Sequence, residues 1–362
     1  MPRGDRFAGD LDDGIVVRPE HQVLPARAVG LDDDVLDRAG GSLLGMACGD
    51  ALGVPYEYGT PPKGAAQMIG GGLGDYAPGE WSDDTQMAVC IAEVAARGVA
   101  LTSRAGLDAV ASSFERWMAD GPADVGAQTQ TVLARAGDLP GPPSRRLALA
   151  AHRLHLDTGR TGGNGALMRT APVALTALMG RWQVALAARA VAELTHADPL
   201  AGDSCVLWSE AIRIAVLEGR LDVRGGLDLI PEERRTSWDR WIGDAERADA
   251  APTLTRNGFT VTALQAAWHA IHVTRGHSAH GASHLLNGLQ AAVQIGGDTD
   301  TVAAIAGALL GARWGAAAVP ARWRQCVHGW PGMRGNDLEA LACSIARASR
   351  PAGPTTALLR WP

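Results

Sequence analysis

The 362-residue sequence has few of the aromatic residues that favour β-sheets: it contains three Tyr and three Phe, against eleven Trp. Ala and Leu, which favour helices, are abundant by comparison. Apolar residues recur at helical spacing, as at Met87, Ile91 and Val94, and no run alternates as a half-buried strand does. These patterns predict an all-α protein.

Cysteine pairs and long apolar runs are also missing. The five Cys are an odd number without a CxxC pair, which argues against a disulfide framework or a zinc knuckle and fits buried thiols in a reducing compartment. The longest apolar run, residues 302–312, is far shorter than the roughly 18 to 20 residues that span a bilayer. The first residues are acidic where a signal peptide needs an apolar core. We therefore expect a cytoplasmic protein without a membrane partner.

The chain has no excess of positive charge: 33 Lys and Arg face 39 Asp and Glu, a net charge of −6, which argues against a nucleic-acid partner. Residues 1–33 show no sustained apolar period, and we expect an N-terminal arm there. One domain is predicted over residues 34–350, followed by a C-terminal tail at residues 351–362. The charge-rich stretch 231–249 contains two Trp and is interpreted as a surface excursion.

Two short polar clusters, residues 82–85 and 298–301, each open an apolar helix and each hold two carboxylates and two hydroxyls. Such residues are favoured N-caps, and carboxylates suit the positive end of a helix dipole. A cap needs only one oxygen, however, and a second carboxylate adds repulsion that a hard cation such as Mg²⁺ or Ca²⁺ would relieve. Together the clusters offer roughly six oxygens, which suits a pair of ions, and no Cys or His is near enough to favour zinc. The residues alone leave the cap and the metal site both open.

Three further segments carry polar residues among glycines or at helix ends. The segment 41–57 is interpreted as a helix of small residues that ends at an acidic turn bracketed by glycines, with Asp50 in it. The loop 162–165 is rich in glycine and precedes Arg169, so its backbone N–H groups and the guanidinium would suit a phosphate, although tight helix packing explains the glycines equally well. His196 follows an apolar helix, as a substrate contact or as a C-terminal cap.

In this order, these segments resemble the ADP-ribosylglycohydrolase family, which includes the hydrolase that reactivates dinitrogenase reductase. The resemblance runs from about residue 40 to residue 315, on the segments GSLLGMACGDALGVPYE, PGEWSDDTQM, GGNGALMRTAPVAL, ELTHADP and LQAAVQIGGDTDTVAAIAGALLG. It implies a compact, single-domain orthogonal bundle of helices with a binuclear Mg²⁺ centre, in which Mn²⁺ is a substitute, at the base of a cleft. Family members remove ADP-ribose from modified protein side chains by cleavage at the anomeric carbon.

The resemblance also implies roles for individual residues. The metal ligands would come from both polar clusters, with Asp300 bridging: Ser82, Asp83, Asp84, Asp298, Asp300 and Thr301. The family usually has Thr where this chain has Ser82, and a hydroxyl is kept. Asp83 or Asp84 would accept the proton of the attacking water, and Glu57 resembles a flap carboxylate above the metals. The substrate contacts would be Gly163, Asn164, Gly165, Arg169 and His196.

The acceptor that carries the ADP-ribose is open. Arginine is preferred because the resemblance is closest to the bacterial members, while serine, O-acetyl-ADP-ribose and a nucleic-acid end remain alternatives. Other hypotheses are a non-catalytic ADP-ribose-binding protein, a phosphohydrolase acting on nucleotides, and an immunity protein whose arm contacts an ADP-ribosylating toxin. Five His between residues 269 and 284 are interpreted as solvated, because no acid or Cys completes a zinc site.

Overall fold

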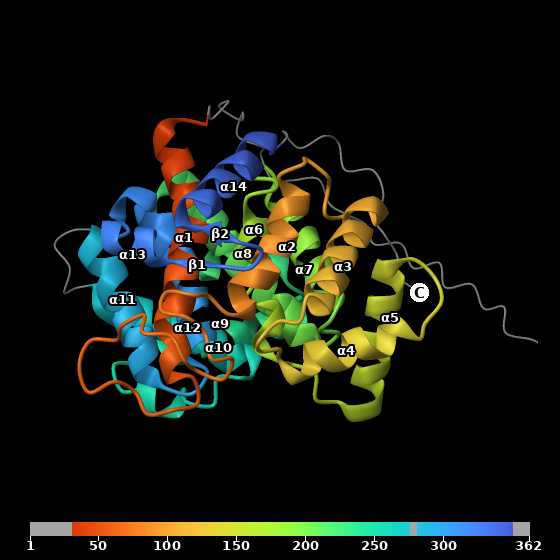
Figure 1. Cartoon of the computed structure of the whole chain (residues 1–362), viewed down its shortest axis with the longest axis horizontal. Coiled ribbons are helices and arrows are strands. Elements are labelled where there is room, and N and C mark those ends of the chain that lie inside the picture. The colour runs from red at the N-terminus through yellow and green to blue at the C-terminus, as the bar shows by residue number, and fades with distance from the viewer. Residues whose placement is uncertain (1–30, 276–280, 350–362) are drawn as a thin grey trace, which may run out of the picture.

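The structure, a computed structural model, describes residues 31–275 and 281–349, and helices make up most of this part (Figure 1). The α-helices are α1 Asp33–Gly53, α2 Asp83–Ala95, α3 Arg104–Ala119, α4 Ala127–Gly137, α5 Pro143–Thr158, α6 Ala171–Ala174, α7 Arg181–Glu193, α8 Pro199–Glu218, α9 Glu232–Ala245, α10 Thr260–Thr274, α11 Gly281–Ile295, α12 Thr299–Trp314, α13 Ala321–Cys326 and α14 Gly335–Ala348. Two short strands, β1 His328–Gly329 and β2 Met333–Arg334, pair antiparallel. The prediction of an all-α fold is confirmed.

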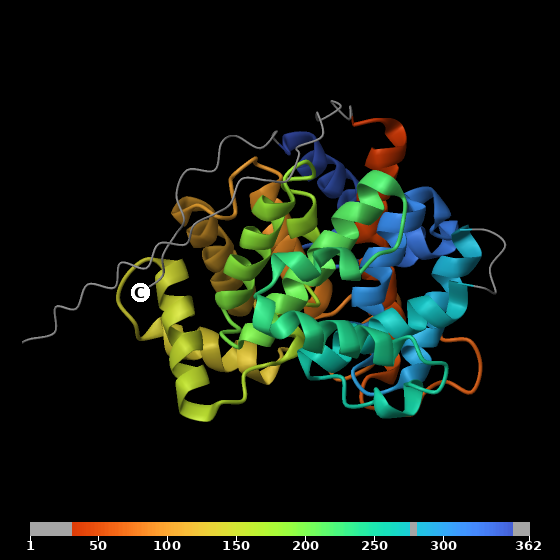
Figure 2. The same cartoon turned by 180° about the vertical axis from the view of Figure 1, so that it is seen from behind.

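Helices α1 and α12 pack antiparallel, nearer to α11 and α13 at one end of the molecule than to α3, α4 and α5 at the other (Figures 1 and 2). Glycines stand at every fourth position of α1 from residue 41 to residue 53, on the side that faces α12. A Cβ at Gly45 would collide with the carbonyl oxygen of Gly307, and a Cβ at Gly49 with that of Ala303. Only glycine therefore permits this close approach of the two backbones.

Replacing Gly49 by Ala is expected to lower the free energy of unfolding by about 3 kcal/mol, because the added Cβ forces two packed helices apart. Chemical denaturation of the purified chain measures this change. Gly137→Ala is the matched control, because a Cβ at this helical position meets nothing within 4 Å. We expect the control to be neutral or slightly stabilising, by about 0.5 kcal/mol. Equal stabilities for the two variants would contradict the packing argument.

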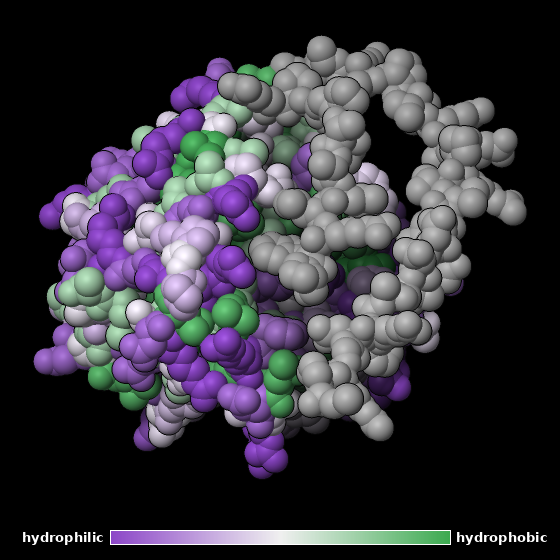
Figure 3. Space-filling model, turned by 90° about the vertical axis from the view of Figure 1, so that its right-hand side faces the viewer, coloured by the Kyte–Doolittle hydropathy of each residue, from purple (hydrophilic) through white to green (hydrophobic). Residues whose placement is uncertain are grey.

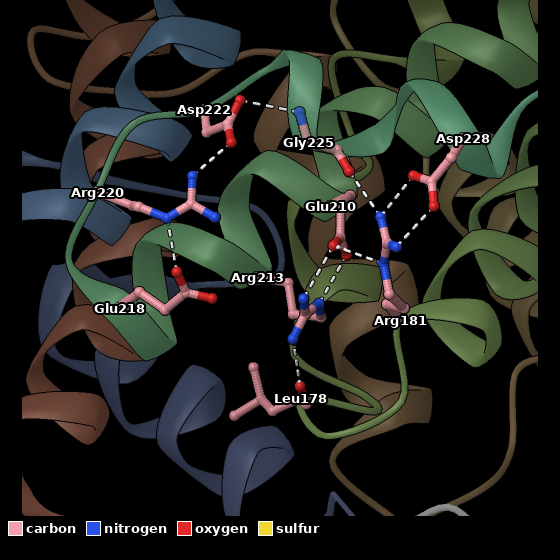
Figure 4. Close-up of polar contacts among 9 residues, drawn as sticks. All are labelled: Leu178, Arg181, Glu210, Arg213, Glu218, Arg220, Asp222, Gly225 and Asp228. Atoms are coloured by element: carbon pink, nitrogen blue, oxygen red, sulfur yellow. Dashed lines mark hydrogen bonds and ion pairs between the residues drawn. The ribbon is translucent and has the colours of Figure 1, made fainter. Parts of the chain in front are cut away.

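A buried carboxylate, Glu210 of α8, ties the start of α7 to the rest of the fold (Figure 4). It accepts hydrogen bonds from Arg213 Nε (2.6 Å) and Nη2 (2.8 Å) and from Arg181 Nε (3.1 Å). Arg213 also donates to the carbonyl of Leu178 (2.9 Å), and Arg181 pairs with Asp228. A buried charge is tolerated when it is fully paired in this way, so the network holds the α7–α8 corner in one arrangement.

The interpretation of residues 231–249 as a surface excursion is wrong for one of the two Trp. Helix α9 forms in this stretch, and Trp238 is fully buried, with its indole N–H donating to Asp203 Oδ2 (3.2 Å). Trp241 packs edge-on against it at a ring distance of 5.2 Å. Charged residues occupy the helix positions between these two Trp, so the charge-rich composition of the stretch did not indicate that the helix has an apolar face.

The predicted arm and tail lie outside the described residues, except for residues 31–33. Asp33 already belongs to α1, and Asp32 caps this helix by accepting a hydrogen bond from Val35 N (2.8 Å). Hydrophilic residues cover much of the described surface on the face seen in Figure 3. Within the described part of the chain, no helix is long and apolar enough to cross a bilayer.

Candidate active site

The two polar clusters lie at the starts of α2 and α12, as their sequence pattern predicts. Ser82 is the N-cap residue of α2 and Asp298 that of α12, yet neither side chain makes the capping hydrogen bond. Ser82 Oγ instead points to two carboxylates, Asp50 (2.8 Å) and Asp84 (3.1 Å). Helix capping therefore does not explain why these residues are present, and the contacts favour the alternative that they hold a cation.

Asp50, on the last turns of α1, is the hub of the first cluster. Its Oδ1 accepts from Ser82 N (2.9 Å) and Ser82 Oγ (2.8 Å), and its Oδ2 from Thr85 N (3.0 Å) and Thr85 Oγ1 (2.6 Å). The glycine stripe of α1 brings this carboxylate beside the start of α12, since Gly53 lies against Asp300. Asp50 thus joins the end of α1 to the first turn of α2.

Two groups of carboxylates have oxygens close enough to share a cation. Asp50, Asp84 and Asp300 form one group, and Glu57, Asp298 and Asp300 form the other, with the ligand atoms of each group within 4.8 Å of one another. Asp300 belongs to both. Asp84 Oδ1 is buried and has no hydrogen-bond partner among the described residues. A hard divalent cation prefers such oxygens, so the two groups, with Asp300 common to both, fit a metal site.

Burial, with repulsion between neighbouring carboxylates added to it, raises the pKa values of these carboxyl groups. Burial, followed by the charge of Asp298, raises the pKa of Glu57 to about 8. Burial and the charge of Asp124 raise the pKa of Asp83 to about 8. Burial raises the pKa values of Asp84 and Asp300 well above the ordinary range, with neighbouring carboxylates adding to the effect. Cations would remove this repulsion and stabilise the ionised forms.

Without metal, the stability of the protein is expected to fall as pH rises. Glu57 and Asp83 have pKa values of about 8 when folded, whereas the unfolded chain titrates near 4. Between these values the folded state binds more protons, so the free energy of unfolding decreases by on the order of 1 kcal/mol per pH unit for each extra proton. Melting temperatures in EDTA from about pH 5 to about pH 8, with excess Mg²⁺ as the comparison, measure this slope. A metal-free slope no steeper than that in Mg²⁺ would contradict it.

The acidic centre opens into a cavity of about 370 Å³. Its floor includes Glu57, Asp83, Asp298, Asp300 and Thr301. The rest of the lining comes mainly from the loop after α1, the start of α4 with the segment before it, and the glycine-rich loop. These lining residues include Tyr58, Leu73, Asp124, Gly126, Ala127, Gln128, Thr129, Gly163, Asn164, Gly165, Met168, His196 and Gly258. No Lys or Arg is among these lining residues.

His196 closes the cavity behind the glycine-rich loop, where a Cβ at Gly163 or Gly165 would press on its ring. Its Nδ1 lies 2.8 Å from Thr195 Oγ1, which itself accepts a hydrogen bond from Arg169 Nη2 (2.5 Å). A hydroxyl can accept two hydrogen bonds, so the contact with Nδ1 forms with either tautomer of the ring; when Thr195 donates to Nδ1, the ring proton lies on Nε2. Burial and the charge of Arg169 lower the pKa of His196 well below its usual value. His196 is therefore a neutral imidazole that lines the cavity.

Comparison with known proteins shows to which family the chain belongs. The model of the family described as ADP-ribosylglycohydrolase matches residues 31–355. The chain belongs to the ADP-ribosylglycohydrolase family. It is accordingly an enzyme of the class that hydrolyses glycosidic bonds to ADP-ribose.

Relatives in this family are similar over most of their length. The ADP-ribosyl-[dinitrogen reductase] glycohydrolase of Rhodospirillum rubrum is 29% identical over 301 residues, which is 80% of this chain and 90% of the relative. The ADP-ribosylarginine hydrolase Tri1 of Pseudomonas putida (strain GB-1) is 29% identical over 318 residues, 84% of this chain and 78% of the relative. A solved structure titled ADP-ribosylglycohydrolase-related protein complex, at 29% identity, superposes with a TM-score of 0.62 and covers 88% of this chain and 99% of its own.

Arg169 does not lie where a substrate contact must lie. Its side chain is fully buried and does not line the cavity. The guanidinium stacks on the ring of Phe114 at 4.5 Å and donates to Thr195. The expectation that it touches a phosphate directly therefore needs correction: Arg169 stands behind His196 and supports it through Thr195. The sequence alone does not show whether the guanidinium group of an Arg after a glycine-rich loop faces the cavity or the buried interior behind it.

Asn164 lines the cavity, as expected of a substrate contact, but its amide nitrogen is already engaged. Nδ2 donates to Asp298 Oδ2 (2.8 Å) and to the carbonyl of Asn257 (3.0 Å). Asn164 thereby orients a carboxylate of the acidic centre. Asp83 also lines the cavity and belongs to neither oxygen group, whereas Asp84 belongs to one and does not line the cavity.

Sequence analysis assigned no role to Asp50, Tyr58, Asp124, Gln128 or Thr129. An acid bracketed by glycines inside an apolar helix was the available signal for Asp50, and no comparable signal marks the other four.

Of the histidines between residues 269 and 284, two are buried structural groups: His269 Nδ1 lies 2.8 Å from the carbonyl of Ala245, and His284 Nε2 lies 2.9 Å from that of Ile271. The interpretation of the whole run as solvated is wrong for these two, and residues 276–280 lie outside the described residues.

Proposed function

We propose that this protein is a Mg²⁺-dependent hydrolase that removes ADP-ribose from ADP-ribosylated arginine side chains, with Mn²⁺ as a substitute metal. The observation that carries the proposal is the pair of carboxylate groups sharing Asp300, of which one, Glu57, Asp298 and Asp300, lines a cavity. When bound, two ions there supply a template for the ribose hydroxyls and polarise the attacking water. Asp50, Glu57, Asp84, Asp298 and Asp300 would hold them, together with the hydroxyls of Ser82 and Thr301 nearby.

The part of the cavity lining that comes from α4 suits a diphosphate. The first turn of α4 faces the cavity and begins at Gly126, which has no side chain to cap it. Thr129, in this turn, is buried, and within the described part of the chain its hydroxyl has no hydrogen-bond partner. The N–H groups of this turn, the glycine-rich loop and His196 Nε2–H add further donors. A helix N-terminus with such neighbours binds phosphate oxygens without a cationic side chain.

Asp83 is the residue that we assign to proton transfer. It lines the cavity, and Gly126 N donates to its Oδ2 (3.3 Å), which helps to orient the carboxylate. Asp84 does not line the cavity, and its Oδ2 accepts from Ser82 and from Thr301 Oγ1 (3.3 Å). Asp83 therefore takes the proton of the water that attacks the anomeric carbon, where the transition state is oxocarbenium-like.

Arginine as the acceptor is supported by Asp124. This carboxylate lines the cavity, and its one hydrogen bond within the described residues comes from Val125 N to Oδ1 (2.8 Å). With no Lys or Arg in the lining, Asp124 offers an unpaired negative charge to a cationic guanidinium. The names of two relatives, the dinitrogen reductase glycohydrolase and the ADP-ribosylarginine hydrolase, point the same way.

The proposal is tested by incubating the purified chain with an ADP-ribosyl-arginine protein and Mg²⁺, with and without EDTA, and identifying the products by mass spectrometry. Release of intact ADP-ribose that requires metal supports the proposal. Release of phosphate or AMP would indicate a phosphohydrolase instead. Metal-dependent binding of ADP-ribose without turnover would indicate a binding protein or another acceptor, for which serine-linked ADP-ribose and O-acetyl-ADP-ribose are the next substrates.

The toxin contact through residues 1–33 and the cytoplasmic location stay predictions. The toxin contact is tested by deleting residues 1–30, which precede α1 and its cap Asp32. Loss of protection against an ADP-ribosylating toxin, with hydrolase activity unchanged, would support an immunity role for the arm.

A further inference from the structure

Tyr58, which follows Glu57, has a backbone conformation that a residue with a side chain rarely adopts. Its φ is +48°, in the left-handed region. Outside glycine this conformation is unfavourable, and it persists where surrounding contacts impose it, often at functional sites. The residue is 62% exposed, so packing against a core does not impose this conformation.

Two hydrogen bonds to the start of α12 hold Tyr58 in this conformation. Its backbone N–H donates to the carbonyl of Gly297 (2.7 Å), and its hydroxyl donates to Asp298 Oδ2 (3.1 Å). Tyr58 also lines the cavity. Tyr58 is therefore held through both its backbone N–H and its hydroxyl to the segment that carries the polar cluster 298–301.

Asp298 is oriented from several sides. Its Oδ2 accepts from Tyr58 Oη and from Asn164 Nδ2 (2.8 Å), and its backbone N–H donates to Asn257 Oδ1 (2.8 Å). No hydrogen bond within the described part of the chain reaches Oδ1. This asymmetric bonding leaves one carboxylate oxygen free while the other is held by two donors.

We propose that Tyr58 is a positioning residue of the metal centre: its hydroxyl orients the Asp298 carboxylate, and its backbone holds Glu57 beside it. The proposal rests on the metal dependence put forward above. Groups that hydrogen-bond a metal ligand fix its orientation and its basicity, and their removal typically weakens metal binding by about 10- to 100-fold. Tyr58 performs this role from the cavity wall without being a ligand itself.

The chain offers a matched control two residues away. Tyr56 belongs to the same short turn, but its hydroxyl accepts from Gln67 N (3.0 Å) and donates to Gln67 O (3.4 Å), away from the carboxylates. Tyr56→Phe and Tyr58→Phe thus each delete one hydroxyl from the same segment. Because the Tyr58 ring is mostly exposed, Tyr58→Phe is expected to fold normally, and circular dichroism checks this.

The experiment titrates the full chain, its Tyr58→Phe variant and its Tyr56→Phe variant with Mn²⁺, and measures free Mn²⁺ by electron paramagnetic resonance. For Tyr58→Phe we expect one of the two ions to bind about 10- to 100-fold more weakly, with Tyr56→Phe equal to the unmodified chain. Equal affinities in all three proteins, or equal losses in both variants, would overturn the role of the Tyr58 hydroxyl. Failure of the unmodified chain to bind Mn²⁺ would overturn the metal centre itself, and this inference with it.

Discussion

Replacing Asp300 by Asn is expected to lower the turnover of ADP-ribosyl-arginine by at least about 1,000-fold, because metal ions contribute several kcal/mol to such a transition state. Asp300 is the one carboxylate present in both oxygen groups, so its loss weakens both sites together. Asn keeps the shape of the side chain but removes its charge. Initial rates at saturating Mg²⁺, together with Mn²⁺ titration, measure both effects.

The same substitution should not unfold the protein. Burial, followed by the charges of Glu57 and Asp84, raises the pKa of Asp300 well above its usual range, so without metal the protonated carboxyl group is favoured and the neutral Asn resembles it. The melting temperature in EDTA is therefore expected to stay equal or to rise. Asp138→Asn, at an exposed position after α4, is the control and should change neither rate nor metal binding. An Asp300→Asn variant that retains metal binding and turnover would rule out the shared carboxylate as the centre of the chemistry.

Replacing Asp124 by Asn is expected to lower kcat/KM for arginine-linked ADP-ribose by about 10- to 100-fold, the value of a hydrogen bond to a charged group. The carboxylate lines the cavity, and its charge also raises the pKa of Asp83 and Glu57. Asn removes the attraction for a guanidinium and keeps the side-chain volume.

Neutral acceptors separate this charge effect from a general loss of activity. Serine-linked ADP-ribose or O-acetyl-ADP-ribose carries no cation at the scissile bond, so Asp124→Asn should change the turnover of any such substrate only through the pKa of Asp83, and by less than it changes the turnover of the arginine-linked substrate. The affinity for free ADP-ribose serves as an internal control and should also be unchanged. An equal loss on charged and neutral substrates, or no loss on the arginine-linked one, would contradict recognition of the guanidinium by Asp124.

The sequence alone predicted the helical fold and the positions of the two polar clusters at helix starts, because both depend on neighbouring residues. Helical periodicity and N-terminal patterns are local, and they survive in any packing of the helices. The roles of Asp50 and Arg169 were not predictable in this way. Whether a polar side chain in an apolar segment faces a cavity or stands behind its wall depends on residues far away in the chain.

The tertiary structure decided which of these local features meet. Asp50, Asp84 and Asp300 are distant in sequence and come together because glycines on α1 let its backbone approach that of α12. The same packing leaves Asp298 and Ser82 without capping bonds and gives Asp300 two groups of partners. A sequence determines its helices through short-range preferences, whereas a site built from three helices requires the long-range contacts that only the packed core provides.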